Sequence, residues 1–134
     1  MKRIPHMNAL MTAFPWHLDA DTPVVDGRRF MQDHDIRHLP VTRQGHELAG
    51  VVHYDDLAPG TEGVLADLML PMCRVDVHER ADQVLDMMAR EHQSVVVVTH
   101  HDRLAGIFTW TDACRGYADM LREPFTPNNG NDVA

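Results

Sequence analysis

Apolar residues in the second half of the chain follow first a helical and then a strand pattern. Over residues 81–88 they recur at spacings of three and four, which places them on one face of a helix. A β-branched run at 95–98 and an apolar stretch at 104–109 flank a short polar loop, a pattern typical of two antiparallel strands. A second helix is expected to open at residues 111–112 and to end near Arg122, because Thr and Asp are favoured at helix N-termini.

The first half of the chain carries the same order of elements with a weaker pattern. A helix is expected over residues 24–34, although Gly27 and Arg28 interrupt its apolar face. Two strands are expected at 39–41 and 48–53. Three further short elements are expected, namely a leading helix at 7–11, a helix after residue 53 that Pro59 ends, and a linker helix at 64–69.

The two halves are copies of one another. Gly50–Asp56 and Gly106–Asp112 lie fifty-six residues apart and share their first Gly, their last Asp and a Leu-Ala-Gly lead-in. Met31 and Met88, further upstream, are fifty-seven residues apart, because the turn between the strands differs by one residue. Repetition at a fixed period indicates that the chain consists of two divergent repeats.

The end of the second copy carries residue types that suit a sugar or a phosphate. Thr109 and Asp112 lie where a strand gives way to a helix, whose first turn offers unpaired N–H groups and partial positive charge. The Thr109 hydroxyl can donate and accept a hydrogen bond, and an ionised Asp112 offers two oxygens to a pair of ribose hydroxyls. A plain strand end followed by a helix cap gives the same pattern, so the repetition is what favours a binding site.

Several motifs recur in the same order and together resemble the CBS (cystathionine β-synthase) domain. They are Met11-Thr12, an extended segment, a helix ending in Met, the strand Leu39-Pro40-Val41, and the Gly-x-x-x-x-x-Asp element. Two such domains in tandem imply an α/β (α+β) fold, in which two repeats related by a pseudo-two-fold each contain a small three-stranded sheet and two helices. The expected divisions are CBS repeat 1 at 7–60, CBS repeat 2 at 61–123 and a disordered tail at 124–134.

The resemblance also implies a ligand, since this element holds the ribose and phosphate of adenosine-containing molecules in CBS pairs. Thr109 and Asp112 of repeat 2 match it fully. In repeat 1 Asp56 matches, but His53 replaces the small hydroxyl residue. We therefore expect two unequal clefts, with the tighter one built on repeat 2.

Residues just before the Leu-Pro-Val strand reach the ligand's phosphates in the family. Here they are Arg37 and His38 in repeat 1, whereas Ser94 and the following valine of repeat 2 carry no charge. The two basic residues suit a solvated helix C-terminus equally well. Trp16 either stacks on a base or fills the core, and the core is favoured.

Charge and composition limit the possible functions. A net charge of −8 excludes general nucleic-acid binding, which needs a basic surface. Eleven of the twelve basic residues are Arg, however, and a local anion-binding pocket is compatible with an acidic chain. No apolar stretch approaches the ~20 residues that cross a membrane. Without a signal-peptide pattern, and with Cys73 and Cys114 interpreted as free thiols, a cytoplasmic location is expected.

The ten histidines do not form a metal-binding pattern, and no nucleophile motif is present, so neither a metal site nor catalytic residues are expected. We therefore expect a regulatory module, and not an enzyme, with an adenine nucleotide as its regulatory ligand and no required cofactor. The alternative is a dimerisation scaffold with degenerate nucleotide clefts, and a small thiol- or metal-dependent enzyme ranks third.

Two kinds of partner are expected. One is the adenosine-containing small molecule. The other is a second copy of the module, because the helix at 81–88 carries apolar residues, Val84 and Met87, beyond a single stripe. The sequence names no regulated partner protein and no particular nucleotide.

Overall fold

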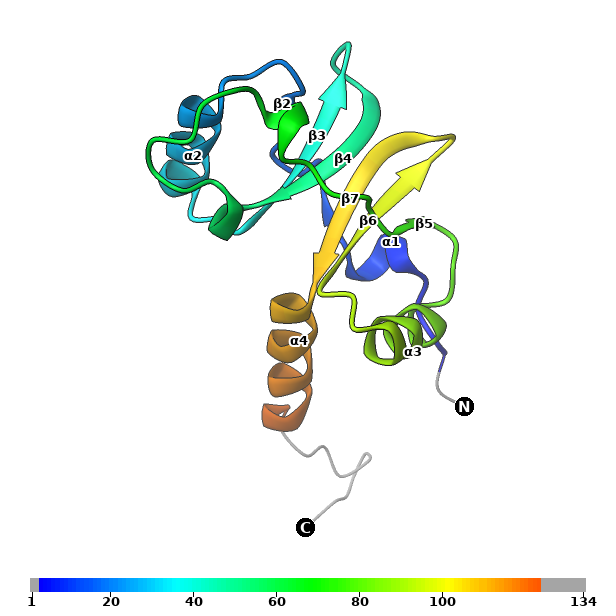
Figure 1. Ribbon diagram of the computed structural model, residues 1–134. Helices are drawn as coiled ribbons and strands as arrows, with labels where there is room; N and C mark the ends of the chain where they lie inside the picture. Colours follow the sequence, from blue (N-terminus) through cyan, green and yellow to red (C-terminus); the bar gives the residue numbers. More distant parts are fainter. Residues whose placement is uncertain (1–2, 124–134) are drawn as a thin grey trace.

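Each repeat contributes three neighbouring strands to one mixed sheet, and the two sets of strands meet in the middle of the molecule (Figure 1). The computed structural model describes residues 3–123; the tail expected at 124–134 lies outside them. Repeat 1 contributes β2 (Leu18–Asp19), β3 (His38–Arg43) and β4 (Glu47–His53), and repeat 2 contributes β5 (Arg74–Asp76), β6 (Val95–His100) and β7 (Arg103–Thr109). The strand order is β2-β3-β4-β7-β6-β5, with Glu47 of β4 paired to Arg103 of β7.

The internal symmetry extends to residue register. Leu18 pairs with Val41 in the parallel pair β2–β3, and Val75 pairs with Val98 in β5–β6. A bulge falls at equivalent places in the two hairpins, after Val41 and after Val98. Each hairpin turns through two residues of positive φ, the geometry that matches the right-handed twist of the flanking strands. The expected pattern of strands is confirmed.

Four α-helices complete the two repeats, namely α1 (Met7–Leu10), α2 (Val24–His34), α3 (Ala81–Glu91) and α4 (Trp110–Arg122). Helices α2 and α3 end in a left-handed residue, Asp35 and His92, which turns the chain into the next strand. Gly27 is buried within α2 and packs against Leu65. A Cβ at this position would lie 2.7 Å from the Leu65 side chain. A missing side chain therefore makes room for the linker, which explains the weak apolar pattern of this helix.

Three expected elements need correction. The helix after residue 53 is a single 3-10 turn, η1 (Tyr54–Asp56), and the linker is another, η2 (Leu65–Asp67), so only repeat 2 has two long helices. The chain is drawn inward at the buried Leu57 directly after η1, and Pro59 then prevents any continuation. Helix α4 begins at Trp110, with Thr109 as its N-cap, because the Thr109 hydroxyl accepts from the Asp112 N–H.

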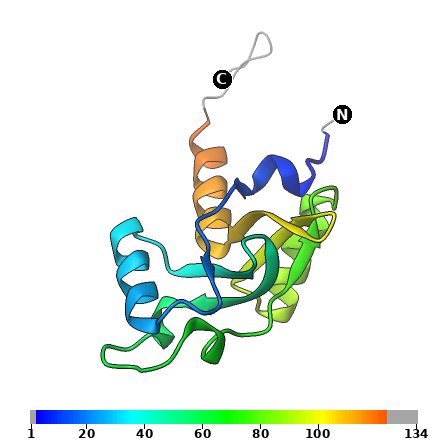
Figure 2. The same ribbon diagram turned by 90° about the horizontal axis from the view of Figure 1, so that it is seen from above.

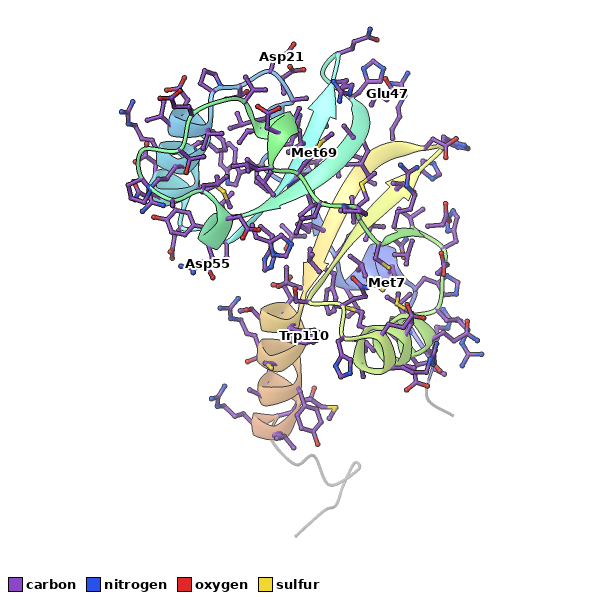
Figure 3. The ribbon with its side chains drawn as sticks, viewed as in Figure 1. Met7, Asp21, Glu47, Asp55, Met69 and Trp110 are labelled. Atoms are coloured by element: carbon purple, nitrogen blue, oxygen red, sulfur yellow. The ribbon has the colours of Figure 1, made fainter. Side chains whose placement is uncertain are left out.

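The two repeats exchange their opening segments. Strand β1 (Thr12–Ala13), from the start of repeat 1, pairs antiparallel with β7 of repeat 2. Leu70, from the start of repeat 2, pairs with Val51 in β4 of repeat 1. Figure 3 shows Met7 beside the helices of repeat 2 and Met69 over the strands of repeat 1. The repeats are therefore interlocked, although their sequences are consecutive.

Three clusters of buried side chains make up the core. One lies under α3 and includes Met7 and Met88, and the second lies under α2 and includes Met31 and Leu65. The third joins the repeats through five residues of the inner strands, Leu48, Val51, Val95, Val97 and Ile107. The view from above in Figure 2 shows α4 standing out from the body, away from α2.

Two glycines provide a matched test of the exchange. Replacing Gly106 by Ala puts a Cβ 2.9 Å from the Thr12 carbonyl oxygen and in collision with the Met11 sulfur. Because backbone blocks relief, we expect Gly106→Ala to lower the free energy of unfolding by about 1–3 kcal/mol. Gly116, inside α4, has nothing within 4 Å of its added Cβ, and we expect Gly116→Ala to raise that free energy by about 0.5–1 kcal/mol.

Urea denaturation of both variants measures the difference. Equal effects would show that β1 does not pack closely on β7.

Candidate functional site

A cavity lies where the opening segment of repeat 1 crosses the end of β7. We call this cavity of about 530 Å³ the Asp112 pocket. Its walls come from the segment 12–16, from the entry to β3, and from the start of α4. Its lining residues are Thr12, Ala13, Phe14, Pro15, Trp16, Asp35, Ile36, Arg37, His38, Pro40, Ile107, Thr109, Thr111, Asp112 and Arg115.

Thr109 and Asp112 form a reciprocal cap at the start of α4. The Thr109 N–H and hydroxyl both donate to Asp112 Oδ2, at 2.9 and 3.1 Å, and the Asp112 N–H donates to Thr109 Oγ1 at 3.2 Å. This capping box satisfies two orphan N–H groups of the helix. Oδ1 of Asp112 receives no hydrogen bond from residues 3–123, so it is left as an acceptor on a side chain that lines the pocket.

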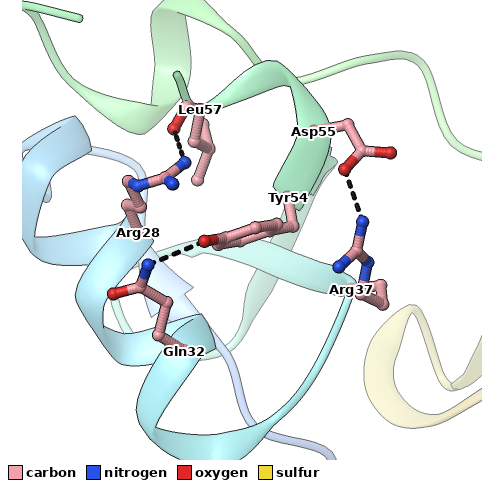
Figure 4. A network of polar contacts seen from close by, with 6 residues as sticks. All are labelled: Arg28, Gln32, Arg37, Tyr54, Asp55 and Leu57. Atoms are coloured by element: carbon pink, nitrogen blue, oxygen red, sulfur yellow. Dashed lines mark hydrogen bonds and ion pairs between the residues drawn. The ribbon is translucent and has the colours of Figure 1, made fainter. Parts of the chain in front are cut away.

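Arg37 reaches the pocket from repeat 1, but its charge is already shared. Its guanidinium donates to the Asp55 carboxylate at 2.5 Å and lies over the Tyr54 ring, 5.0 Å from the centroid (Figure 4). The guanidinium of Arg28 also lies over this ring, 4.7 Å from the centroid. Gln32 donates to the Tyr54 hydroxyl at 2.7 Å and so fixes the ring. These contacts hold Arg37 at the pocket wall and partly neutralise it.

His38 is the first residue of β3 in repeat 1, and it lines the Asp112 pocket. Its ring is 4.7 Å from that of His53, which is its partner across the β3–β4 ladder. Partial burial lowers the pKa of His38 below its usual range, and the nearby His53 and Arg37 lower this pKa further. Asp55 and Asp112 act in the opposite direction with smaller effect. His38 therefore faces the pocket as a mainly neutral imidazole near pH 7.

A second, smaller cavity of about 190 Å³ is the pseudo-symmetric counterpart, and we call it the His53 pocket. It is lined by His53, by the segment 70–73 and by residues 92–95, with Val51 and Val97 at its floor. Asp56 lines neither cavity; it is exposed on η1. Since η1 is one turn long and Asp55 binds Arg37, no carboxylate reaches the His53 pocket as Asp112 reaches its own.

The six expected site residues are thus divided. Thr109, Asp112, Arg37 and His38 meet in the Asp112 pocket, although they come from different repeats. His53 lies in the smaller pocket, and Asp56 lies outside both.

Sequence reasoning missed Arg115 and Phe14 and was wrong about Trp16. Arg115 follows Asp112 by three residues, a spacing that puts both side chains on one helix face, so it could have been found. Phe14 has a positive φ of 51° and is 93 % exposed at the pocket wall. Trp16 does not fill the core, because it is 55 % exposed and stacks on His34 at a ring distance of 4.0 Å.

Other chemistry has little support in the described part of the chain. Residues 3–123 contain no cluster of three or more potential metal ligands. Burial raises the pKa of the Cys73 thiol, and the nearby Glu91 and Glu79 raise it further, so this thiol is held in its unreactive protonated form. Within the same residues, no helix has both the length and the apolar character to span a bilayer.

Sequence comparison identifies the family. The CBS domain profile matches residues 7–59 and again 65–119. The chain therefore belongs to the CBS domain family and contains two consecutive copies of the domain, as the resemblance implied. No curated protein sequence gives a significant match.

Solved structures share the fold at low sequence identity. A protein from Vibrio cholerae named for acetoin utilization (AcuB) superposes with a TM-score of 0.81 and 21% identity, over 97% of this chain and 100% of that one. CBSX2 in complex with AMP gives 0.77 and 21%, over 88% and 99%. The CBS domain pair of MJ0100, in complex with 5′-methylthioadenosine and S-adenosyl-L-methionine, gives 0.78 and 20%, over 88% and 99%.

The lowered pKa of His38 predicts a stability effect. Between that pKa and about 6.5, the usual value, the unfolded chain binds a proton that the folded chain does not. Above about pH 6.5 the neutral His38 therefore makes its full contribution to the free energy of unfolding. This contribution is lost as the pH falls through the lowered pKa of the folded protein. We expect His38→Asn to flatten this part of the pH profile.

Urea unfolding measured from about pH 5 to pH 7.5 tests this. His46→Asn, in the exposed β3–β4 turn, is the control and should keep the wild-type slope. Identical slopes for all three proteins would exclude His38 as the cause.

Proposed function

We propose that this chain is a regulatory module that binds an adenine nucleotide in the Asp112 pocket. The observation that carries the proposal is the meeting, in one cavity, of Asp112 and Thr109 from repeat 2 with Arg37 and His38 from repeat 1. A ligand that bridges these groups stabilises one arrangement of the two repeats, which is how binding would be coupled to a partner. The AMP complex of CBSX2 and the adenosyl complexes of MJ0100 support the choice of ligand.

The chemistry of the pocket suits the parts of a nucleotide. The free Oδ1 of Asp112 accepts from ribose hydroxyls, while Oδ2 stays committed to the helix cap. The apolar side chains of Pro40 and Ile107 offer a surface for a base, and Trp16 lies at the same wall. A volume of about 530 Å³ is within the range of small-molecule sites.

The proposal involves no catalysis and no resident cofactor. The Thr109 hydroxyl is committed to the helix cap, where it donates to the Asp112 carboxylate and accepts from the Asp112 N–H. We place the module in the cytoplasm, where adenine nucleotides are abundant and where free thiols such as Cys73 and Cys114 persist.

Asp112 and Asp56 provide a test of which repeat binds the ribose. Asp112→Asn keeps an oxygen for the helix cap but replaces the free carboxylate oxygen, so each unmet ribose hydroxyl weakens binding by roughly 5- to 150-fold. Asp56→Asn is the matched control, because Asp56 lines neither cavity. We expect calorimetry with AMP to show the loss only for Asp112→Asn.

Greater damage from Asp56→Asn would place the binding site in repeat 1. Thermal melting of both variants without ligand checks that each is folded.

An exposed helix also favours self-association, which is the function that the alternative hypothesis of a dimerisation scaffold assigns to the chain. Helix α4 is amphipathic, yet none of its residues is buried. Its large apolar side chains are 44–66 % exposed, and they are Trp110, Tyr117, Met120 and Leu121. A surface helix of this kind normally covers its apolar face with another element.

We infer that a second copy of the module covers α4, in place of the interface expected at 81–88. Val84 is buried in the core of its own repeat, and Met87 is partly buried against the same core. An antiparallel pairing of two α4 helices about Tyr117 would put Ala113 opposite Leu121 and Cys114 opposite Met120. A small side chain would then face a large one at both ends, and each pair would occur twice because a two-fold contact is reciprocal.

Charged residues on α4 test the dimer. Light scattering over a dilution series should show a dimer for the wild type and a monomer for Leu121→Asp, because a buried unpaired carboxylate is costly. The control is Arg122→Asp, on the polar face of the same helix. A monomeric wild type, or a dimeric Leu121→Asp, would contradict the assignment.

A further inference from the structure

The charged side chains around the Asp112 pocket are unequal in their freedom to bind an anion. Five titratable or charged residues line it, namely Asp35, Arg37, His38, Asp112 and Arg115. The cation of Arg37 is bound by Asp55 at 2.5 Å and lies against the Tyr54 ring. His38 is a weak cation at neutral pH because partial burial lowers its pKa. Neither group offers a full unshared charge.

Arg115 is different. It follows Asp112 by three residues in α4, so both side chains lie on the helix face that forms the pocket wall. Among residues 3–123, no carboxylate lies within ion-pair distance of Arg115. Asp119 lies one helical turn after Arg115, but its carboxylate is instead 3.6 Å from the guanidinium of Arg122. Arg115 is therefore an exposed guanidinium with its donors uncommitted.

The same charges limit how much negative charge the pocket accepts. Two carboxylates, Asp35 and Asp112, line it together with one unshared guanidinium. A monophosphate brings about two negative charges and matches the planar fork of one Arg. A triphosphate would bring still more negative charge to the same guanidinium and would place it near two carboxylates, so its repulsion from the pocket walls would exceed that of a monophosphate.

We propose that Arg115 binds the phosphate of the ligand and that the Asp112 pocket therefore selects a nucleoside monophosphate over both the free nucleoside and the triphosphate. This inference rests on the proposed function, since it concerns the same pocket. Asp112 would hold the ribose, and Arg115, on the same face of α4, would hold the phosphate. Arg37 would contribute less, because Asp55 competes for it.

Calorimetric titration with adenosine, AMP and ATP tests the proposal on the full chain. The wild type should bind AMP at least about tenfold more tightly than adenosine or ATP, the gain expected from a charge-assisted hydrogen bond. Arg115→Gln should reduce AMP affinity to within about twofold of adenosine affinity and leave adenosine affinity unchanged. Arg115→Lys keeps the charge and should recover part of the AMP preference.

The control is Arg122→Gln, which removes a cation from the same helix outside the pocket and should preserve the wild-type order of ligands. AMP affinity unchanged in Arg115→Gln, or ATP bound more tightly than AMP by the wild type, would overturn the inference. In either case, adenosine binding that Asp112→Asn abolishes would still uphold the proposed function. Wild-type protein that binds neither adenosine nor AMP would overturn both.

Discussion

The exchange of opening segments between the repeats is the constraint on which the rest of the structure depends. Met11 packs over Gly106, and Met69 packs over Gly50, so each repeat is closed by a residue from the other. A Cβ at Gly106 would lie 2.9 Å from the Thr12 carbonyl oxygen, and a Cβ at Gly50 would lie 2.9 Å from the Met69 sulfur. The same crossing lays residues 12–16 along the end of β7, where they become one wall of the Asp112 pocket. The contacts between residues 12–16 and β7 therefore both join the two repeats and form the pocket wall.

A local difference between the repeats accounts for the inequality of their pockets. Repeat 2 continues from its last strand into the thirteen-residue helix α4, whereas repeat 1 continues into one 3-10 turn before the buried Leu57. The long helix carries a capped start, with Asp112 held by Thr109 and facing the cavity. The short turn leaves Asp56 in solvent and turns Asp55 toward Arg37. Asp55 thus serves the structure of repeat 1 at a position where repeat 2 has Thr111 in its pocket wall.

Sequence reasoning succeeded where the signal is local or repeated. The helix at 81–88 and the four long strands follow from periodicity, and the family follows from two ordered sets of motifs. It failed where contacts join segments distant in sequence. Nothing near Asp55 in the sequence indicates that it binds Arg37, eighteen residues away, and nothing near Met11 indicates Gly106. For Trp16 the core was favoured over stacking on a base, but its ring stacks on His34 and is exposed.

The acidic character of the chain is compatible with an anionic ligand because charge acts locally in this pocket. At about 0.15 M salt the interaction between exposed charges decays over about 8 Å, so distant surface carboxylates contribute little to the pocket. The groups that matter are those on its walls, and their pairing decides how they act. Arg37 is compensated by Asp55, and Asp112 directs one oxygen into the α4 cap. Arg115, which has no ion-pair partner among residues 3–123, follows Asp112 by three residues on the same face of α4. Ribose and phosphate would therefore be recognised by the first two turns of one helix.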